Sequence, residues 1–572
     1  MISFYLNGKR HELTQLNPNT TVLEYLRLHE GQTDTKEGCG SGDCGACTVM
    51  VQRLPNASQQ VLNDENGDEK NATPPFYTIN SCITLVSLMD GHHLMTASYL
   101  ADNPEHHPER ALLHPAQQAM VECHGSQCGF CTPGFVMSLA CVYENNRMQT
   151  SQETASQNDA KQLSYDEVVA SISGNLCRCT GYRPIIEAGL LMSDIGQQRE
   201  AEQSAVKDLT ISLATDAMRS TKESAVSENV LDNVELKNEE SKAIAPVISD
   251  AGRQLYMPKS LDELNQVLAA NPKATIWAGG TDLGLSVTQH LVDHEVIIQL
   301  SGVEALKSWS LLDAKPDSSN KDLNNEQAPS QSLVLGAGMS YQQMLPVLEQ
   351  YFPSFAQVFE RIASPQIRNM GTIGGNIANA SPIGDLPPIL LALDASIHLR
   401  HCAHNHEESG NDLDNSDSVY TDEIIPLSEF FLDYKKTKLQ AGSYVVAIHI
   451  PLMHDNQHLF IHKISKRYED DISACLLAAR IDVSADGMTI ENAKLGLGGM
   501  AAIPLLATTC QQALIGQAAE VASFEQAAQV LSADVTPMTD VRASREYRSH
   551  VVQRLLVKCG KQLVAGRQTE TA

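Results

Sequence analysis

Ten of the fourteen cysteines lie between Cys39 and Cys179, and this concentration limits what the chain can fold into more than any other feature. The first ten residues, Met1 to Arg10, place their charges after a short apolar stretch, which is the wrong order for a secretory signal. We therefore expect a cytoplasmic protein in a reducing compartment, where structural disulfides are rare. The clustered cysteines are then candidates for binding metal.

The first cysteine group is Cys39, Cys44 and Cys47, which have the C-x4-C-x2-C spacing of a plant-type [2Fe-2S] ferredoxin. Cys82 is available as the distant fourth ligand. The residues between the cysteines are small, so the backbone can wrap a cluster and direct N–H groups at its sulfur atoms. A structural zinc site is the alternative, although zinc motifs favour paired short spacings.

A second group combines a C-x2-C pair, Cys128 and Cys131, with a C-x-C pair, Cys177 and Cys179. By itself this set is as compatible with zinc as with iron. Two four-thiolate sites in one cytoplasmic chain favour two electron carriers in series. The other six cysteines are expected to be small buried hydrophobic residues. They are Cys123, Cys141, Cys402, Cys475, Cys510 and Cys559.

The cysteine-rich half is expected to form two domains. In residues 1–100, an alternating run crosses the dipeptide Asn7-Gly8, a strong hairpin-turn signal, which predicts a small β-rich domain. In residues 101–195, apolar residues recur at helical spacing, and Ser164 is placed to cap a helix over 165–172. This second domain is therefore predicted to be helical.

A flexible linker is expected over residues 196–250, because no Phe, Tyr or Trp occurs from Arg183 to Leu255 and the segment is rich in polar residues. The segments 56–71 and 403–421 are polar and acidic, and they are expected to be surface loops.

Two glycine-rich loops mark the C-terminal half, Ile276–Gly284 and Asn369–Asn376. Neither contains the G-x-G-x-x-G fingerprint, and Leu335–Gly338 lacks the third glycine, so a Rossmann dinucleotide site is not indicated. Successive N–H groups in such turns can nevertheless hold a pyrophosphate. Taken singly, each loop is better explained as an ordinary tight turn.

Composition excludes several function classes. The formal net charge of −28 argues against nucleic acid as a partner. No stretch approaches the roughly 18 uncharged apolar residues of a membrane span, so we expect no membrane insertion. Nucleophile-elbow, P-loop and H-E-x-x-H motifs are absent from the sequence, which argues against hydrolase and phosphotransferase chemistry.

Taken together, these motifs resemble the molybdenum hydroxylase family. Three segments, 37–49, 125–134 and 174–184, closely resemble the family's iron–sulfur half, and 371–385 is similar to its FAD domain. Both halves occur in the order found in the xanthine dehydrogenases, and the resemblance covers nearly everything except the linker and the acidic loops. It implies an α+β multidomain protein. The expected parts are a β-grasp ferredoxin-like domain (1–100), a helical [2Fe-2S]-binding bundle domain (101–195), the linker (196–250), an α+β FAD-binding domain of the molybdenum hydroxylase type (251–440) and a C-terminal α/β domain extending it (441–572).

The resemblance also implies which residues hold the cofactors. One [2Fe-2S] cluster would be ligated by Cys39, Cys44, Cys47 and Cys82, and the other by Cys128, Cys131, Cys177 and Cys179. No residue is expected to act as a catalytic acid or base. The implied FAD contacts are Ile276, Trp277, Ala278, Gly279, Gly280, Thr281, Asp282, Leu283, Thr372, Ile373, Gly374, Gly375, Asn376, Asp385 and Lys463. One departure from the family is visible, because Ile362 stands where some relatives place an aromatic residue against the flavin ring.

The function implied is that of a xanthine dehydrogenase small subunit of the bacterial type. A molybdopterin-binding large subunit would oxidise hypoxanthine and xanthine, and electrons would pass through the helical-domain cluster and the ferredoxin-like cluster to FAD and then NAD+. A hetero-oligomer such as a dimer of heterodimers is expected. Two alternatives stay open: the same subunit of another molybdenum hydroxylase, acting on an aldehyde or an N-heterocycle, and a non-catalytic scaffold stapled by zinc.

Overall fold

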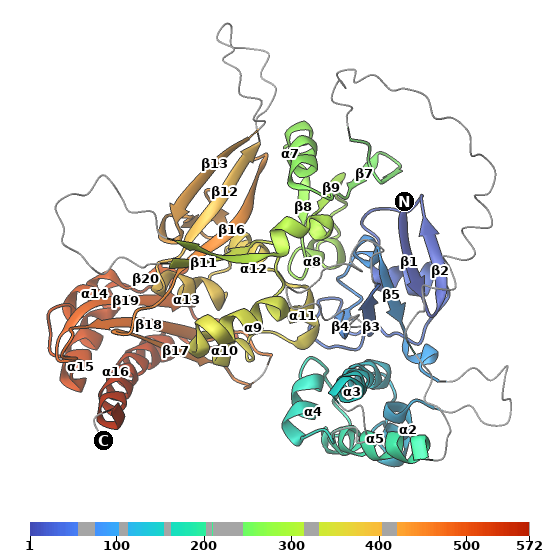
Figure 1. The fold of residues 1–572 in the computed structure, drawn as a ribbon, viewed down its shortest axis with the longest axis horizontal. Coiled ribbons are helices and arrows are strands. Elements are labelled where there is room, and N and C mark those ends of the chain that lie inside the picture. Colours follow the sequence, from blue (N-terminus) through green and yellow to red (C-terminus); the bar gives the residue numbers. More distant parts are fainter. Residues whose placement is uncertain are drawn as a thin grey trace, which may run out of the picture. The chain divides into compact units, whose positions relative to one another are not determined.

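The computed structural model describes residues 1–54, 75–101, 113–153, 162–201, 209, 244–313, 331–402, 420–468 and 470–570. It divides into two compact units, Met1–Leu255 with Gly284–Asp293, and Tyr256–Leu283 with His294–Ala572 (Figure 1). Most of the expected linker and nearly all of the two expected acidic loops lie outside the described residues. Within those ranges no helix is both long and apolar enough to cross a lipid bilayer.

The chain begins with a five-stranded sheet in the order β2-β1-β5-β3-β4. Its strands are β1 (Ile2–Leu6), β2 (Lys9–Leu13), β3 (Thr48–Arg53), β4 (Phe76–Asn80) and β5 (His92–Met95). Asn7 and Gly8 both have positive φ angles, 50° and 77°, which is the backbone a two-residue hairpin turn requires, so the predicted hairpin is confirmed. The short helices α1 (Val22–Glu24) and η1 (Tyr25–His29) precede the first cysteine loop.

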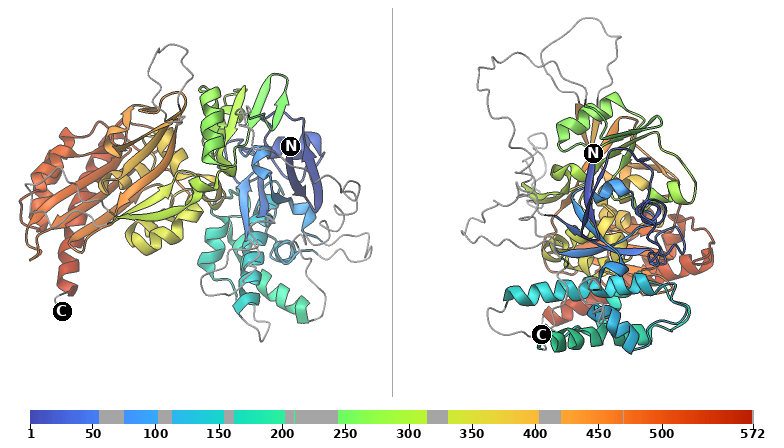
Figure 2. Two further views of the ribbon diagram at one scale, coloured as in Figure 1. Left: turned by 45° about the horizontal axis from the view of Figure 1, so that its top comes forward. Right: turned by 90° about the vertical axis from the view of Figure 1, so that its right-hand side faces the viewer.

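Four helices follow, and Figure 2 shows them gathered as one group: α2 (Pro115–Glu122), α3 (Thr132–Glu153), α4 (Tyr165–Ile172) and α5 (Arg183–Ala201). The cap predicted at Ser164 is confirmed, because its hydroxyl accepts from the Glu167 N–H while the Glu167 carboxylate accepts from the Ser164 N–H. Helix α5 continues six residues past the boundary expected at 195. Met50, Phe76 and Met95 of the sheet share one hydrophobic core with these helices, so the two parts pack as one unit.

The glycine-loop region contains two short strand pairs. β6 (Ile248–Asp250) pairs antiparallel with β7 (Arg253–Tyr256), and β8 (Thr275–Trp277) pairs parallel with β9 (Val296–Gln299). Helices α7 (Leu261–Ala270) and α8 (Gly284–Thr288) lie between them in sequence. The first glycine loop therefore connects β8 to α8.

A second five-stranded sheet has the order β10-β11-β16-β12-β13. Its strands are β10 (Trp309–Asp313), β11 (Gln331–Gly336), β12 (Ser396–Cys402), β13 (Tyr420–Pro426) and β16 (Ser443–Pro451), and a two-stranded ribbon is formed by β14 (Phe431–Asp433) and β15 (Lys436–Thr437). The helices between β11 and β12 are α9 (Tyr341–Tyr351), α10 (Pro353–Phe359), α11 (Pro365–Met370), α12 (Ile373–Asn379) and α13 (Leu386–Ala392). Because β16 pairs with β11 and β12, the sheet extends past residue 440, and the change to the next sheet falls between Pro451 and Gln457.

The C-terminal sheet is antiparallel throughout, in the order β17-β18-β19-β20, with strands β17 (Gln457–Ile464), β18 (Cys475–Val483), β19 (Ile490–Gly498) and β20 (Leu505–Leu506). Helices α14 (Thr508–Leu514), α15 (Val521–Val530) and α16 (Arg545–Glu570) cover one face (Figure 2). Every residue of β18 is buried, because Cys475 and Leu477 face these helices while Leu476 and Ala478 join the core of the preceding sheet.

Candidate cofactor sites

The first cysteine group lies in the loop between η1 and β3, with Cys82 in the turn after β4. Gly40, Gly42 and Gly45 all have positive φ angles, 63°, 80° and 66°, so the loop adopts a curled backbone that glycine tolerates best. Asn80 closes the loop by donating to the Gly42 carbonyl at 2.6 Å. The loop conformation thus depends on the glycines that the spacing interleaves with the cysteines.

Four thiols gather here as two pairs. Cys44 donates to Cys39, which lowers the pKa of Cys39 to about 4, and the same contact raises the pKa of Cys44. Cys82 donates to Cys47, lowering the pKa of Cys47 and raising that of Cys82. The Ser41 N–H also lies 3.4 Å from the Cys39 sulfur, as expected for a backbone that directs donors at the metal-binding sulfurs.

The second group lies at helix ends, with Cys128 and Cys131 before α3 and Cys177 and Cys179 between α4 and α5. It is again paired: the sulfurs of Cys128 and Cys179 are 3.6 Å apart, and Cys131 contacts Cys177. Burial, helped by this contact, raises the pKa of Cys131 to about 12. Burial also opposes ionisation of Cys177, but hydrogen bonds from Thr180, Cys179 and Cys131 together outweigh it, so that its pKa is lowered.

The paired arrangement matches what a two-iron cluster needs, because four thiolates are shared between two irons. In the part of the chain that the structure describes, no set of three or more His, Cys, Asp or Glu side chains is arranged to hold a single ion. All eight predicted ligands are found in these pairs. Of the other six cysteines, five are buried as expected and Cys123 is half-buried.

The two glycine loops line one cavity of about 320 Å³, within the range of small-molecule sites. Most of the predicted FAD contacts line it: Ile276, Ala278, Gly279, Gly280, Thr281, Asp282, Leu283, Thr372, Gly374, Gly375 and Asn376. Trp277 and Ile373 are neighbours of these lining residues in sequence, and their side chains are buried. Two loops nearly a hundred residues apart are thus brought to one site.

Close backbone approach explains why glycine is needed in these loops. A Cβ atom on Gly279 would lie 1.7 Å from the Met370 carbonyl oxygen, and one on Gly374 would lie 2.5 Å from the Ala337 Cβ atom. Any larger residue would force the loops apart. The cavity therefore depends on contact between the β8–α8 loop and the segment that leads into α12.

Two buried polar atoms beside the cavity lack a hydrogen-bond partner among the described residues: Nε1 of Trp277 and Oδ1 of Asn376. Such groups are costly to bury unless something satisfies them. A cavity with two glycine loops, apolar walls and unsatisfied polar groups fits a nucleotide cofactor such as FAD.

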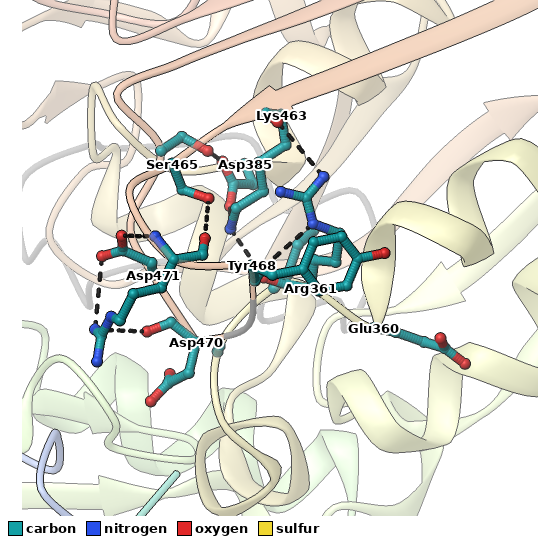
Figure 3. A network of polar contacts seen from close by, with 12 residues as sticks. Glu360, Arg361, Asp385, Lys463, Ser465, Tyr468, Asp470 and Asp471 are labelled. Carbon is teal, nitrogen blue, oxygen red and sulfur yellow. Dashed lines mark hydrogen bonds and ion pairs between the residues drawn. The ribbon is translucent and has the colours of Figure 1, made fainter. Parts of the chain in front are cut away.

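The remaining predicted contacts, Asp385 and Lys463, do not line this cavity. They form a buried ion pair instead, with Nζ of Lys463 2.7 Å from the Asp385 carboxylate. Lys463 also donates to the Arg361 carbonyl, and Ser473 donates to Asp385. Figure 3 shows this pair beside the contact in which the Arg361 guanidinium lies 4.4 Å from the centre of the Tyr468 ring.

Sequence reasoning missed several lining residues. They are Leu300, Ala337, Tyr341, Ala378, Asn379, Leu439, Ser443, Tyr444 and Val445. Ala337 lies inside the Leu335–Gly338 segment, whose glycines could have drawn attention to it. Strand β16 offers no such signal, because Ser443, Tyr444 and Val445 read as an ordinary buried strand. Ile362 is buried in the core of this unit and does not line the cavity.

Four family models match successive parts of the chain. Residues 4–87 match the 2Fe-2S iron-sulfur cluster binding domain, and residues 100–190 match the [2Fe-2S] binding domain. Residues 250–413 match the FAD binding domain in molybdopterin dehydrogenase, and residues 460–563 match the CO dehydrogenase flavoprotein C-terminal domain. The expected fold class and the expected pair of [2Fe-2S] domains with an FAD-binding domain are confirmed.

Individual relatives are distant. Xanthine dehydrogenase 1 of Arabidopsis thaliana is 26% identical, over 94% of this chain and 38% of the plant protein. Aldehyde oxidase 1 of Bos taurus is 25% identical, over 90% of this chain and 36% of the bovine protein. A structure of reconstituted CO dehydrogenase from Oligotropha carboxidovorans is 23% identical, over 54% of this chain and 95% of that chain, with a TM-score of 0.44. The chain spans less than two fifths of the length of the plant and bovine proteins.

Proposed function

We propose that this chain, which carries the iron–sulfur and FAD portion of a molybdenum hydroxylase, is the electron-transfer subunit of a xanthine dehydrogenase. A molybdopterin-binding large subunit would oxidise hypoxanthine and xanthine, and NAD+ would be the final electron acceptor. The assembly is proposed to be a cytoplasmic hetero-oligomer, such as a dimer of heterodimers.

The observation that carries the proposal is the combination of sites on one chain. Two sets of paired thiols lie in one unit, and a cavity lined by two glycine loops lies in the other. When bound, the clusters pass single electrons and FAD collects two of them for hydride transfer to NAD+. A chain with this complement is suited to link a two-electron oxidation to a nicotinamide.

The residues of the chain hold and tune these groups. The eight paired cysteines would supply the cluster thiolates, and the donors at Ser41 and Thr180 would stabilise negative charge on the sulfurs. In the cavity, the loop after β8 and the start of α12 would hold the FAD pyrophosphate, and Asn376 offers one unsatisfied acceptor. No side chain has to transfer a proton for this role.

Xanthine is proposed as the substrate class because the match to the plant xanthine dehydrogenase spans nearly all of this chain. The match to bovine aldehyde oxidase is of similar extent and supports the alternative, a subunit serving aldehyde oxidation. Substrate choice would lie with the large subunit in either case.

The test is co-purification with the neighbouring large polypeptide, followed by a xanthine-dependent assay of NADH formation. We expect about four irons and one FAD per chain, because two clusters hold two irons each. The chain by itself should oxidise NADH with an artificial acceptor and should not hydroxylate xanthine. Purified anaerobic protein that contains zinc and no iron would support the scaffold alternative and overturn the proposal.

A further inference from the structure

We infer that Asn175 locks the two cysteine loops together and thereby sets the electron-transfer contact between them. The inference rests on the proposed function, since it concerns the path between the two clusters. Asn175 is only 2% exposed and lies two residues before Cys177, yet its side chain is directed at the loop that contains Cys44 and Cys47.

A backbone hydrogen bond already joins the two loops. The N–H of Leu176 donates to the carbonyl of Cys44 at 2.9 Å. Leu176 is the neighbour of Cys177, so one hydrogen bond connects the main chain of a ligand of the first group to the residue beside a ligand of the second group. The polypeptide itself offers no short connection between these points, because Cys44 and Cys177 are far apart in sequence.

The carboxamide of Asn175 fixes the position of one loop relative to the other at this hydrogen bond. Its Nδ2 donates to the Gly45 carbonyl at 2.9 Å and lies 3.2 Å from Oγ1 of Thr48. Its Oδ1 accepts from the Ser138 hydroxyl at 2.7 Å, which fixes the orientation of the amide. Each polar atom of the side chain is therefore paired, with one contact to the first loop, one to Thr48 at the start of β3 and one to α3.

The fit around Asn175 leaves no room for adjustment. A Cβ atom on Gly45 would lie 2.2 Å from the Gly174 carbonyl oxygen and 2.8 Å from the Asn175 Cα atom. A Cβ atom on Gly134 would lie 2.2 Å from the Gly45 carbonyl oxygen. Glycines on both sides let the two cysteine loops meet main chain to main chain.

The step that this contact serves is simple to balance. If both clusters are bound, the cysteines of the second group would hold the one-electron donor and those of the first group the one-electron acceptor, and the transfer would need no bond to be made or broken and no proton to be moved. The donor in the whole enzyme would be the molybdenum centre of the partner. Asn175 would act as a positioning residue, because it touches the loops rather than the metal.

The test is Asn175→Asp in the full chain, since aspartate keeps the size and the acceptor but loses the Nδ2 donor. A photochemical one-electron donor would reduce the protein, and freeze-quench electron paramagnetic resonance would follow the electron between the two clusters. We expect transfer to slow severalfold, because the rate of electron tunnelling falls exponentially as the separation of the two clusters grows. The spin–spin coupling of the two fully reduced clusters should weaken as well.

Ser173→Ala is the matched control, because this half-buried serine lies two residues away and donates to the Ala170 carbonyl. It should leave both readouts unchanged. Ser138→Ala, which removes the donor that orients the Asn175 amide, should slow transfer by less than Asn175→Asp, and it replaces that variant if Asn175→Asp does not fold. Unchanged transfer and coupling in a variant with both clusters loaded would overturn the inference, whereas a wild-type chain without iron would overturn the proposed function.

Discussion

The cysteine sites and the glycine-loop cavity are built in opposite ways. Each cysteine group comes from two short segments whose ligands follow one another within a few residues, so that its geometry is set by local turns. The cavity takes its walls from the β8–α8 loop, the turn after β11, α9, α12 and β16, which are spread over about 170 residues of sequence. The cysteine sites therefore follow from the spacing of residues in the sequence, whereas the cavity follows from the packing of distant segments.

This difference predicts that the two kinds of site fail independently. The cysteine groups lie in one unit and the cavity lies in the other, and each unit has its own hydrophobic core. A change at a thiol should remove iron and leave FAD, and a change that disturbs the packing around the cavity should do the reverse. Variants can test this contrast.

The largest effect is expected from Cys47→Ala. Cys47 is fully buried, so no water or added thiol can replace its sulfur, and iron should fall from about four to about two per chain with FAD retained. Cys179→Ala removes an exposed ligand instead, and an added small thiol should restore part of the lost cluster. Iron, flavin and paramagnetic signals measured on both variants check this. Loss of FAD together with iron in Cys47→Ala would show that the sites are coupled.

The next effect concerns the buried ion pair in the flavin unit. Asp385→Asn leaves the Lys463 ammonium buried without its counter-charge, which should cost about 3–5 kcal/mol of stability in this unit. FAD content should fall while iron stays at the wild-type level, as thermal unfolding and cofactor analysis would show.

Two further variants control this result. Asp433→Asn removes a carboxylate from an exposed pair with Lys436, and it should change neither stability nor cofactor content. Adding Lys463→Met to Asp385→Asn removes the unpaired charge and should restore part of the lost stability. No recovery in the double variant would mean that the charge is not the cause.

A smaller effect is expected within the cysteine loops. Gly45 and Gly129 both have positive φ angles, but a Cβ atom on Gly45 would collide with Gly174, whereas one on Gly129 meets nothing within 4 Å. Gly129→Ala should therefore cost about 1 kcal/mol of backbone strain, and Gly45→Ala about 1–3 kcal/mol more from overpacking. Chemical denaturation of the iron-loaded proteins measures both. Equal losses would show that φ alone decides the cost.

The same contrast explains what could be predicted from sequence. The hairpin at Asn7-Gly8 and the cap at Ser164 follow from one or two residues, and the structure has both. The cysteine spacing indicated all eight thiols, which lie in pairs. In each case the information is local, since turn and cap chemistry act over a few residues.

The cavity could be predicted only in part. The glycines indicated two of its loops. The sequence around Tyr341 and Ser443 contains no motif that predicts a cavity, because a helix residue and a strand residue come to line it only through tertiary packing. The domain boundary at 440 shows the same limit, since strand order and not composition places β16 in the preceding sheet. Asp385 and Lys463 were predicted as contacts to FAD, and the structure pairs them with each other.

The smallest effect tests that packed wall directly. The Ser443 hydroxyl lies 2.8 Å from Nδ1 of His401, and Nε2 of His401 lies 3.3 Å from the Glu423 carboxylate. In the neutral imidazole with its N–H directed at Glu423, Nδ1 accepts the Ser443 proton, so the serine oxygen offers only lone pairs to the cavity that it lines. Ser443→Ala should therefore weaken FAD binding by about 1 kcal/mol, roughly fivefold in Kd.

Flavin fluorescence titration of FAD-depleted protein measures this change, and iron content should not move. Ser484→Ala provides the control, because its hydroxyl donates to Asp486 at an exposed turn of the same unit. Unchanged FAD affinity in Ser443→Ala would mean that this hydroxyl serves only to hold His401 and Glu423 in the sheet. FAD binding would then depend mainly on the two glycine loops. The cavity would resemble the cysteine sites, because short sequence segments and not the packing of distant strands would decide whether it binds FAD.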